Sequence, residues 1–340
     1  MDALLKKIIT ASGVSGYESE IAKIMYEELK KSCDEVAIDN FGNVIAKKGS
    51  GKKKVMLAAH MDEIGLLVKN ITKDGFVGFI KVGGIDDRIL PAQRMVIKSK
   101  KGDCSGIIGV KPPHLQKEEE RRQGIKYEDM FIDIGCKTKE EALGKIAIGD
   151  AVIFEPNAGA LNEKLFYGKA IDNRAGCFAL LKIMEKAKGD AQIFAVATVQ
   201  EEVGLKGAKT SSFKVSPDFA IVIDTNVAGD TPQIKERESA LKLGEGVGIT
   251  IMEASGRGLI VSEKIRDLLI ETAGKNKIKY QIDVIEGGMT DGAVIYMNRE
   301  GIPTGALAIP TRYVHSPCGV FNIDDLNACV ELAVKVVGEI

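Results

Sequence analysis

Several residues that could bind metal or act as a general base stand at the ends of apolar runs. In chain order they are His60 and Asp62 after VMLAA, Asp172 in GKAIDNRAG, Glu201 and Glu202 after IFAVATVQ, Asp224 after FAIVI, and His315 after IPTRYV. In open α/β sheets, binding and catalytic groups gather outside the carboxyl ends of the strands. We therefore expect these side chains to meet in one site.

The residue types favour a catalytic metal site. The chain has three histidines, and His60 and His315 are two of them. Imidazoles mixed with carboxylates suit divalent ions such as zinc or cobalt, and the lack of clustered cysteines argues against a structural zinc site. Two such ions need one bridging carboxylate and about two further ligands each, which this set can supply. Of the adjacent Glu201 and Glu202, one could bind metal while its neighbour takes a proton from water.

Each residue alone is a weak signal. An aspartate beside a strand, such as Asp172 or Asp224, is more often a helix cap or a turn residue. A single partly buried histidine is commonly just hydrogen-bonded, and paired glutamates usually cover a solvated face. The occurrence of all these residues at successive strand ends carries the prediction.

The elements that must position these residues indicate an α/β protein. Residues 3 to 31 have apolar positions at helical spacing, interrupted by SGVSGYESE, where Ser15 or Gly16 could begin a second helix. After residue 165, apolar strands alternate with helices. This alternation predicts a mixed, largely parallel sheet with helices on both faces.

The middle of the chain has a different pattern. Residues 66–165 contain short β-branched runs punctuated by glycine, which predict a small β-rich domain. Within it, the polar segment 111–130 predicts an exposed connecting loop, with a binding loop as the alternative. We therefore expect a discontinuous α/β domain, 1–65 and 166–340, with 66–165 inserted.

Composition excludes several classes of partner. The formal net charge is −1 over 340 residues, which leaves no field to attract nucleic acid or anionic lipid. No apolar run approaches the roughly 18 to 20 residues that span a bilayer, and MDALLKKIITASG lacks the hydrophobic stretch of a signal peptide. The six cysteines are scattered without a CxxC pair, as is typical of reduced thiols. We expect a cytoplasmic protein without nucleic-acid or membrane partners.

The sequence resembles the tetrahedral (TET) aminopeptidases, a family of di-metal exopeptidases. The family includes glutamyl, leucyl, lysyl and deblocking aminopeptidases, and some of its members are labelled endoglucanase. The resemblance extends over nearly the whole chain and is carried by AAHMDEIGLLV, GKAIDNRAG, VQEEVGLKGA, IVIDTN and GMTDGAVIYMNREGIPTGALAIPTRYVHSP. It implies a zinc-peptidase-type α/β catalytic domain with an inserted PDZ-like β domain near residues 66–165.

The resemblance also implies a role for each candidate residue. It places His60 and Asp224 on one metal, Glu202 and His315 on the other, and Asp172 as the bridge between them. Glu201 becomes the general base. Asp62 becomes the residue that orients the His60 ring through its other N–H.

The resemblance further implies an assembly and a class of substrate. Dimers formed through the inserted domain would build a tetrahedral dodecamer, and peptides would be trimmed from the amino end. His114, in VKPPHLQ of the insertion, could approach a neighbouring active site in such an oligomer, and the alternative is a surface histidine.

Two positions depart from the family pattern. Many relatives have HSPxE, whereas HSPCGV puts Gly319 at the position of that glutamate, which could alter the support of His315. Many relatives also have Asp-Asp where this chain has Asp172 and Asn173. Neither departure removes a candidate ligand.

Two alternatives come from other classes of protein. A glycoside hydrolase (endoglucanase) needs two carboxylates that flank a sugar and has no need of the histidines. The absence of tryptophan and an aromatic content of 5% also count against it. A non-catalytic, oligomeric peptide-binding protein would be expected to have a damaged ligand set, and here the set is complete.

Overall fold

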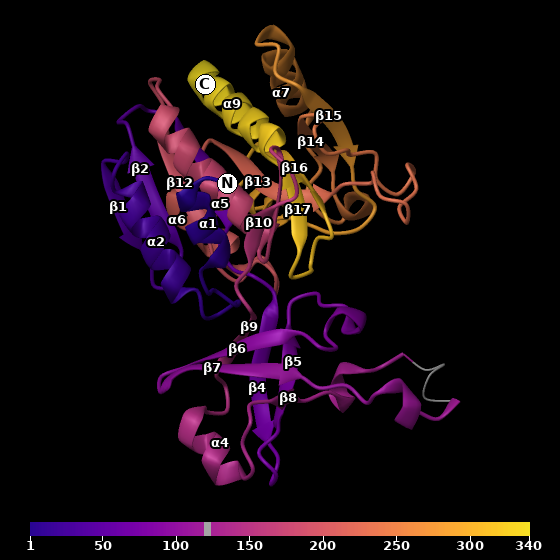
Figure 1. The fold of residues 1–340 in the computed structure, drawn as a ribbon. Coiled ribbons are helices and arrows are strands. Elements are labelled where there is room, and N and C mark those ends of the chain that lie inside the picture. The colour runs from indigo at the N-terminus through magenta and orange to yellow at the C-terminus, as the bar shows by residue number, and fades with distance from the viewer. Residues whose placement is uncertain (119–123) are drawn as a thin grey trace.

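The computed structural model describes residues 1–118 and 124–340 and consists of an α/β body with a small barrel at one end (Figure 1). The helices are α1 (Ala3–Thr10), α2 (Ser19–Leu29), α4 (Lys139–Lys145), α5 (Ile171–Lys186), α6 (Lys206–Val215), α7 (Glu263–Lys275), α8 (Gly292–Ile295) and α9 (Ile323–Glu339). In the described ranges, none of the helices is at once long and apolar enough to cross a membrane. Of the segment 111–130, most described residues are exposed, and residues 119–123 lie outside the described part.

A mixed sheet forms the centre of the body. Its strands are β1 (Glu35–Ile38), β2 (Val44–Lys48), β3 (Lys54–His60), β10 (Ala158–Ala160), β11 (Leu165–Gly168), β12 (Gln192–Thr198), β13 (Phe219–Val227), β14 (Val247–Met252), β15 (Tyr280–Val284), β16 (Thr304–Arg312) and β17 (Gly319–Asn322). Strands β12, β3, β13 and β16 are neighbours in this order and run parallel.

The prediction of a largely parallel sheet is correct only for this centre and for the pair β14 and β15. Strands β1 and β2 on one side, and β17, β11 and β10 on the other, pair antiparallel. Short connections join β1 to β2 and β10 to β11, and such connections return the chain in the antiparallel sense.

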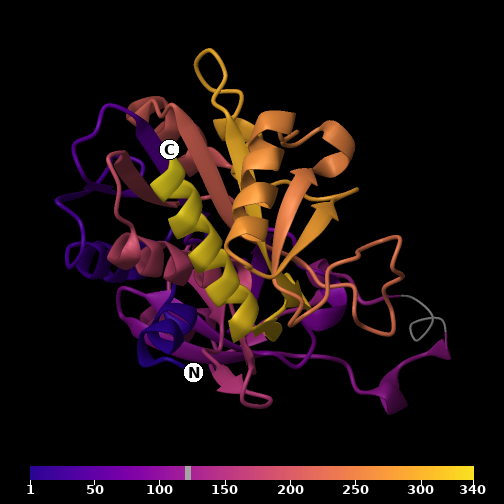
Figure 2. The same cartoon turned by 90° about the horizontal axis from the view of Figure 1, so that it is seen from above.

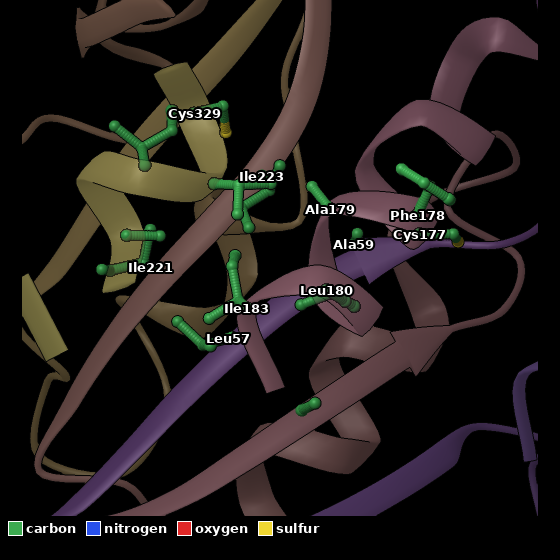
Figure 3. Packing of buried hydrophobic residues seen from close by; sticks show 14 of the residues in the cluster. Leu57, Ala59, Cys177, Phe178, Ala179, Leu180, Ile183, Ile221, Ile223 and Cys329 are labelled. Atoms are coloured by element: carbon green, nitrogen blue, oxygen red, sulfur yellow. The ribbon is translucent and has the colours of Figure 1, made fainter. Parts of the chain in front are cut away.

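Helices cover both faces of the sheet, as predicted. Leu57 of β3 and Ile221 of β13 point to the face where α5 contributes Leu180 and Ile183 (Figure 3). The next residue of β3, Ala58, belongs to a cluster on the opposite face with residues of α6 and α8, because successive strand residues point to opposite sides. Figure 2 shows α9, in yellow, across the first face with α7 beside it.

The inserted part closes into a barrel with its own core. The barrel strands are β4 (Gly65–Ile71), β5 (Val77–Val82), β6 (Arg94–Ser99), β7 (Gly102–Ile108), β8 (Ile132–Asp133) and β9 (Ala151–Phe154), in the order β4-β5-β8-β7-β6-β9. Leu66, Ile97, Ile132 and Val152 are fully buried in it. Strand β10, which falls within 66–165, pairs with β11 in the large sheet.

The second helix begins later than either residue that we predicted for its start. Gly16 has φ +88°, a left-handed conformation, so the chain turns at this position. Ser15 uses its hydroxyl to donate a hydrogen bond to Asp62, and α2 begins only at Ser19. The segment before α2 is therefore a turn against the sheet.

Candidate active site

The carboxyl ends of the central strands bring the predicted residues together. His60 is the last residue of β3 and lies beside Thr198, the last residue of β12, in the parallel ladder. Glu201 and Glu202 follow β12, and Asp224 lies in β13, where it pairs in register with Ala308 of β16. Asp172, at the start of α5, and His315, after β16, complete one cavity of about 560 Å³.

Asp172 lies between the two imidazoles. Its Oδ1 is 3.1 Å from Nε2 of His60, and its Oδ2 is 3.4 Å from Nε2 of His315. His315 Nε2 is also 3.4 Å from Oε2 of Glu202, while His60 Nε2 is 3.6 Å from Oδ1 of Asp224 and 3.9 Å from Oε2 of Glu201. One carboxylate therefore contacts both halves of the cluster.

Two groups of side chains have the spacing needed to hold a metal ion. In the first group, ligand atoms of His60, Glu201 and Asp224 all lie within 4.8 Å of one another, and in the second those of His60, Asp172 and Glu202 do. His60 is common to both groups. His315 joins the second group through its contacts with Asp172 and Glu202.

Asp62 is fully buried beneath this cluster. It accepts hydrogen bonds from the backbone N–H of Glu201 at 3.0 Å, from that of Glu202 at 3.2 Å, and from the Ser15 hydroxyl at 2.6 Å. Its Oδ1 is 3.4 Å from Nδ1 of His60, and this ring nitrogen forms no hydrogen bond. Asp62 therefore holds the turn that carries both glutamates and lies next to the His60 ring.

Burial and repulsion between carboxylates change the pKa values of the acids in the site. Burial raises the pKa of Glu202 to about 8 and also raises the pKa values of Glu201 and Asp224. The hydrogen bond to Asp172 raises the pKa of His315 to about 9. Burial opposes ionisation of Asp172, but its hydrogen bonds to His315 and His60 lower its pKa below the usual range. The site thus has more carboxylates than its two imidazoles can neutralise.

The donor set fits a cation. Glu202 Oε1 is buried without a hydrogen-bond partner, and such atoms are costly unless another group satisfies them. Carboxylate oxygens and imidazole nitrogens are ligands for zinc and other divalent ions of the first row. These side chains could therefore hold metal ions.

A glycine turn of the barrel also contacts the site. Gly83 and Gly84 follow β5, and the carbonyl oxygen of Gly84 lies 3.0 Å from Nδ1 of His315. A Cβ atom on Gly84 would lie 2.9 Å from this nitrogen, and one on Gly83 would lie 3.3 Å from Oε2 of Glu202. Sequence reasoning missed this contact, because glycines in an inserted domain carry no chemical signal of their own.

Asp291 is a further acid that our sequence reasoning did not assign. It is buried, it accepts a hydrogen bond of 2.5 Å from the Thr198 hydroxyl, and its Oδ1 has no partner. Burial raises its pKa to about 7. The motif GMTDG contains it, but Asp291 does not directly follow an apolar strand, which was our criterion for candidates.

Two other positions were singled out in the sequence. Gly319 lies beside the cluster, and His114 lies away from it. A Cβ on Gly319 would come within 3.1 Å of Ile171, so this position packs closely beside Asp172. His114 is exposed in the 3-10 turn Pro113–Leu115 of the inserted part. Its approach to a neighbouring subunit stays a prediction.

The whole chain is similar to aminopeptidases of known sequence. A model of the family described as M42 glutamyl aminopeptidase matches residues 42–332. A protein of Acetivibrio thermocellus that carries the name aminopeptidase is 41% identical over 98% of this chain and 97% of its own length. The lysyl aminopeptidase of Pyrococcus furiosus is 36% identical over 99% of this chain and 96% of its own length.

Solved structures of similar proteins have the same fold. A TET aminopeptidase from a marine Thaumarchaeota archaeon has a TM-score of 0.95 at 34% identity, covering 99% of this chain and 95% of its own. The TET1 peptidase of Pyrococcus horikoshii, described as assembling into a tetrahedron or a large octahedral shell, has a TM-score of 0.90 at 35% identity and covers 99% of both chains. An endoglucanase of Thermotoga maritima has a TM-score of 0.81 at 32% identity, covering 98% of this chain and 96% of its own.

Proposed function

Since the chain belongs to the M42 glutamyl aminopeptidase family and is a peptide hydrolase, we propose that it is a two-metal aminopeptidase that removes residues from the amino end of peptides. The observation that carries this proposal is the position of Asp172, with one oxygen toward each imidazole of the site. A carboxylate in such a place is suited to bridge two ions.

The ligand roles follow the two halves of the cluster. His60 and Asp224 would hold one ion, Glu202 and His315 the other, and Asp172 would bind both. When bound, divalent ions such as zinc or cobalt polarise a peptide carbonyl and lower the pKa of water.

Glu201 is the general base in this proposal. Burial and the neighbouring acids Asp224, Asp291 and Glu202 raise its pKa well above the usual value, so Glu201 binds a proton more readily than a free carboxylate does. It would take a proton from the attacking water and deliver it to the leaving nitrogen. Asp62 would keep Glu201 in place through its hydrogen bond to the backbone and would orient the His60 ring.

We also propose the finer features that the family resemblance implies. Residues 1–65 and 166–340 would form the catalytic domain, and the PDZ-like insert, 66–165, would mediate dimers that assemble into a dodecamer. The TET1 peptidase of Pyrococcus horikoshii, which can assemble into a tetrahedron or a large octahedral shell, supports such an assembly. A cytoplasmic location is supported by the free thiols of the six cysteines.

Hydrolysis of aminoacyl p-nitroanilides tests the proposed function. The protein loaded with zinc or cobalt should release p-nitroaniline from at least one aminoacyl derivative, and EDTA should stop the reaction. No release from any derivative by metal-loaded, folded protein would contradict the proposal.

A glycosidase is the second candidate because of the name of the Thermotoga maritima relative. The cavity favours it less, since no aromatic side chain for sugar stacking is among the described residues that line it. Cellulose cleavage that survives EDTA would favour the glycosidase. Metal binding without turnover of either class of substrate would favour the non-catalytic peptide-binding protein.

A further inference from the structure

The cavity around the cluster has a charged part and an uncharged part. The charged part is the set His60, Asp172, Glu201, Glu202, Asp224 and His315, whose ligand atoms lie close together. Among the described residues, every other one that lines the cavity is uncharged. The apolar members of this remainder are Leu205, Val227, Ile285, Met289 and Val314.

The uncharged part of the cavity, called the uncharged wall below, comes from segments at the same edge of the sheet. Leu205 follows the turn of the two glutamates, and Val227 ends β13. Ile285 and Met289 lie in the loop between β15 and α8, and Val314 directly precedes His315. Met289 is 49% exposed and Val227 is 39% exposed, so both offer apolar surface that a ligand can still cover.

The first side chain of a peptide substrate must be placed beside the bond that is cut. If the charged part holds the metals and the reacting groups, as proposed above, this side chain must lie against the uncharged wall. A lysine or glutamate side chain would find no opposite charge there beyond groups already engaged at the reaction centre, and an unpaired charge is disfavoured in a cavity. An aliphatic side chain would instead cover apolar surface.

We infer that this site selects peptides whose first residue has a neutral, apolar side chain of the size of leucine or methionine, with Met289 as a specificity-determining residue. The inference rests on the proposed function. The preference inferred for this chain differs from the lysine and glutamate in the names of the lysyl relative and of the glutamyl family, and those names describe other proteins.

A comparison of substrates tests the preference. The metal-loaded protein is assayed with leucyl, methionyl, glutamyl and lysyl p-nitroanilides, and kcat/KM is measured for each. We expect the leucyl and methionyl substrates to exceed the other two by roughly tenfold or more, the scale on which apolar pockets discriminate. If kcat/KM for the glutamyl or the lysyl substrate equals or exceeds the values for the leucyl and methionyl substrates, the inference is overturned while the aminopeptidase function stands. If no substrate is hydrolysed, the proposed function itself is contradicted.

Charge substitutions at Met289 test the assignment of the residue. Met289→Arg should raise the ratio of glutamyl to leucyl kcat/KM about tenfold, and Met289→Glu should raise the ratio of lysyl to leucyl similarly, because each supplies the missing opposite charge. Met297→Arg and Met297→Glu are the matched controls, since Met297 is 61% exposed and does not line the cavity. Unchanged ratios in folded, metal-loaded Met289 variants, or equal changes in the Met297 controls, would refute the role of Met289.

Discussion

The two adjacent glutamates after β12 have different neighbours. Glu201 Oε2 lies 3.9 Å from His60, and Glu202 Oε2 lies 3.4 Å from His315. Their backbone N–H groups are both bound by Asp62, so the turn holds the two side chains in different halves of the cluster. The structure thus offers a physical basis for giving two residues of the same type separate tasks.

Replacing each glutamate by glutamine should separate these tasks. Glu201→Gln should lower kcat by roughly 10²- to 10⁴-fold, the usual contribution of a general base, while the bound metal is retained. Glu202→Gln should lose metal on dialysis, because an amide is a poorer ligand than a carboxylate. Metal analysis beside kinetics checks both variants, with the exposed Glu300→Gln as control. Full turnover by Glu201→Gln would exclude its role as the base.

Metal binding should release protons at neutral pH. Without metal, the pKa of Glu202 is about 8 and that of His315 is about 9, so both groups are mainly protonated at pH 7. Ligands must be deprotonated, and metal affinity should therefore rise as pH increases from about 6 to 9. Calorimetry in buffers of different ionisation enthalpy measures the released protons, and Glu202→Gln should release fewer. Heats that do not depend on the buffer would contradict the expectation.

Sequence reasoning located the cluster because its members are chemically distinctive and follow apolar strands. Asp224 could be proposed from FAIVID alone, since the strand and the acid are contiguous. Ser15 and Gly84 could not be proposed in this way. They contact the site through a turn before α2 and a turn of the barrel, and only the packing of distant segments brings these turns to the strand ends.

At the scale of elements, the turn that follows β5 of the barrel contacts the site at the edge of the large sheet. Gly84 accepts a hydrogen bond from Nδ1 of His315 when this nitrogen carries the proton, which leaves Nε2 free for a metal. The close approach needs the absence of a Cβ atom. The inserted barrel therefore contributes to the geometry of the site in its own chain.

Gly84→Ala should disturb His315 more than it disturbs folding. A Cβ at 2.9 Å from Nδ1 forces the ring or the turn to move, so metal content and turnover should fall, while the free energy of unfolding changes by only about 1 kcal/mol through one hydrogen bond. Metal analysis and urea unfolding measure the two effects. Gly144→Ala in α4 is the control, because nothing lies within 4 Å of its added Cβ. Normal metal content in Gly84→Ala would show that the turn does not position His315.

Some parts of the fold could be predicted from the sequence and others could not. The alternation of strands and helices predicted the parallel centre and the helices on both faces, because these depend on local periodicity. The antiparallel pairing of β17 with β11 was not predicted, since these strands come together only through tertiary pairing of segments far apart in the chain. The start of α2 was misplaced because Ser15, a typical capping residue, is used instead to hold Asp62.

At the scale of the whole molecule, the barrel exposes apolar side chains that an assembly could cover. Ile107 of β7 is 54% exposed, and Ile148, between α4 and β9, is 59% exposed. If the insert mediates dimers, Ile107→Asp should weaken them, because a charge would be buried without a partner. Met297→Asp is the control, since Met297 is 61% exposed and lies in the part 166–340, outside the insert.

Light scattering should give a mass of about 440 kDa for the parent protein, twelve times the 36.6 kDa of the chain, and a smaller mass for Ile107→Asp. The smaller species should still hydrolyse leucyl p-nitroanilide, because one chain supplies every residue of the cluster and also the Gly84 turn. An unchanged mass would argue against dimers formed through this face of the barrel. Loss of turnover on dissociation, with metal retained, would instead show that a neighbouring subunit completes the site, and His114 is the residue of the insert to substitute next.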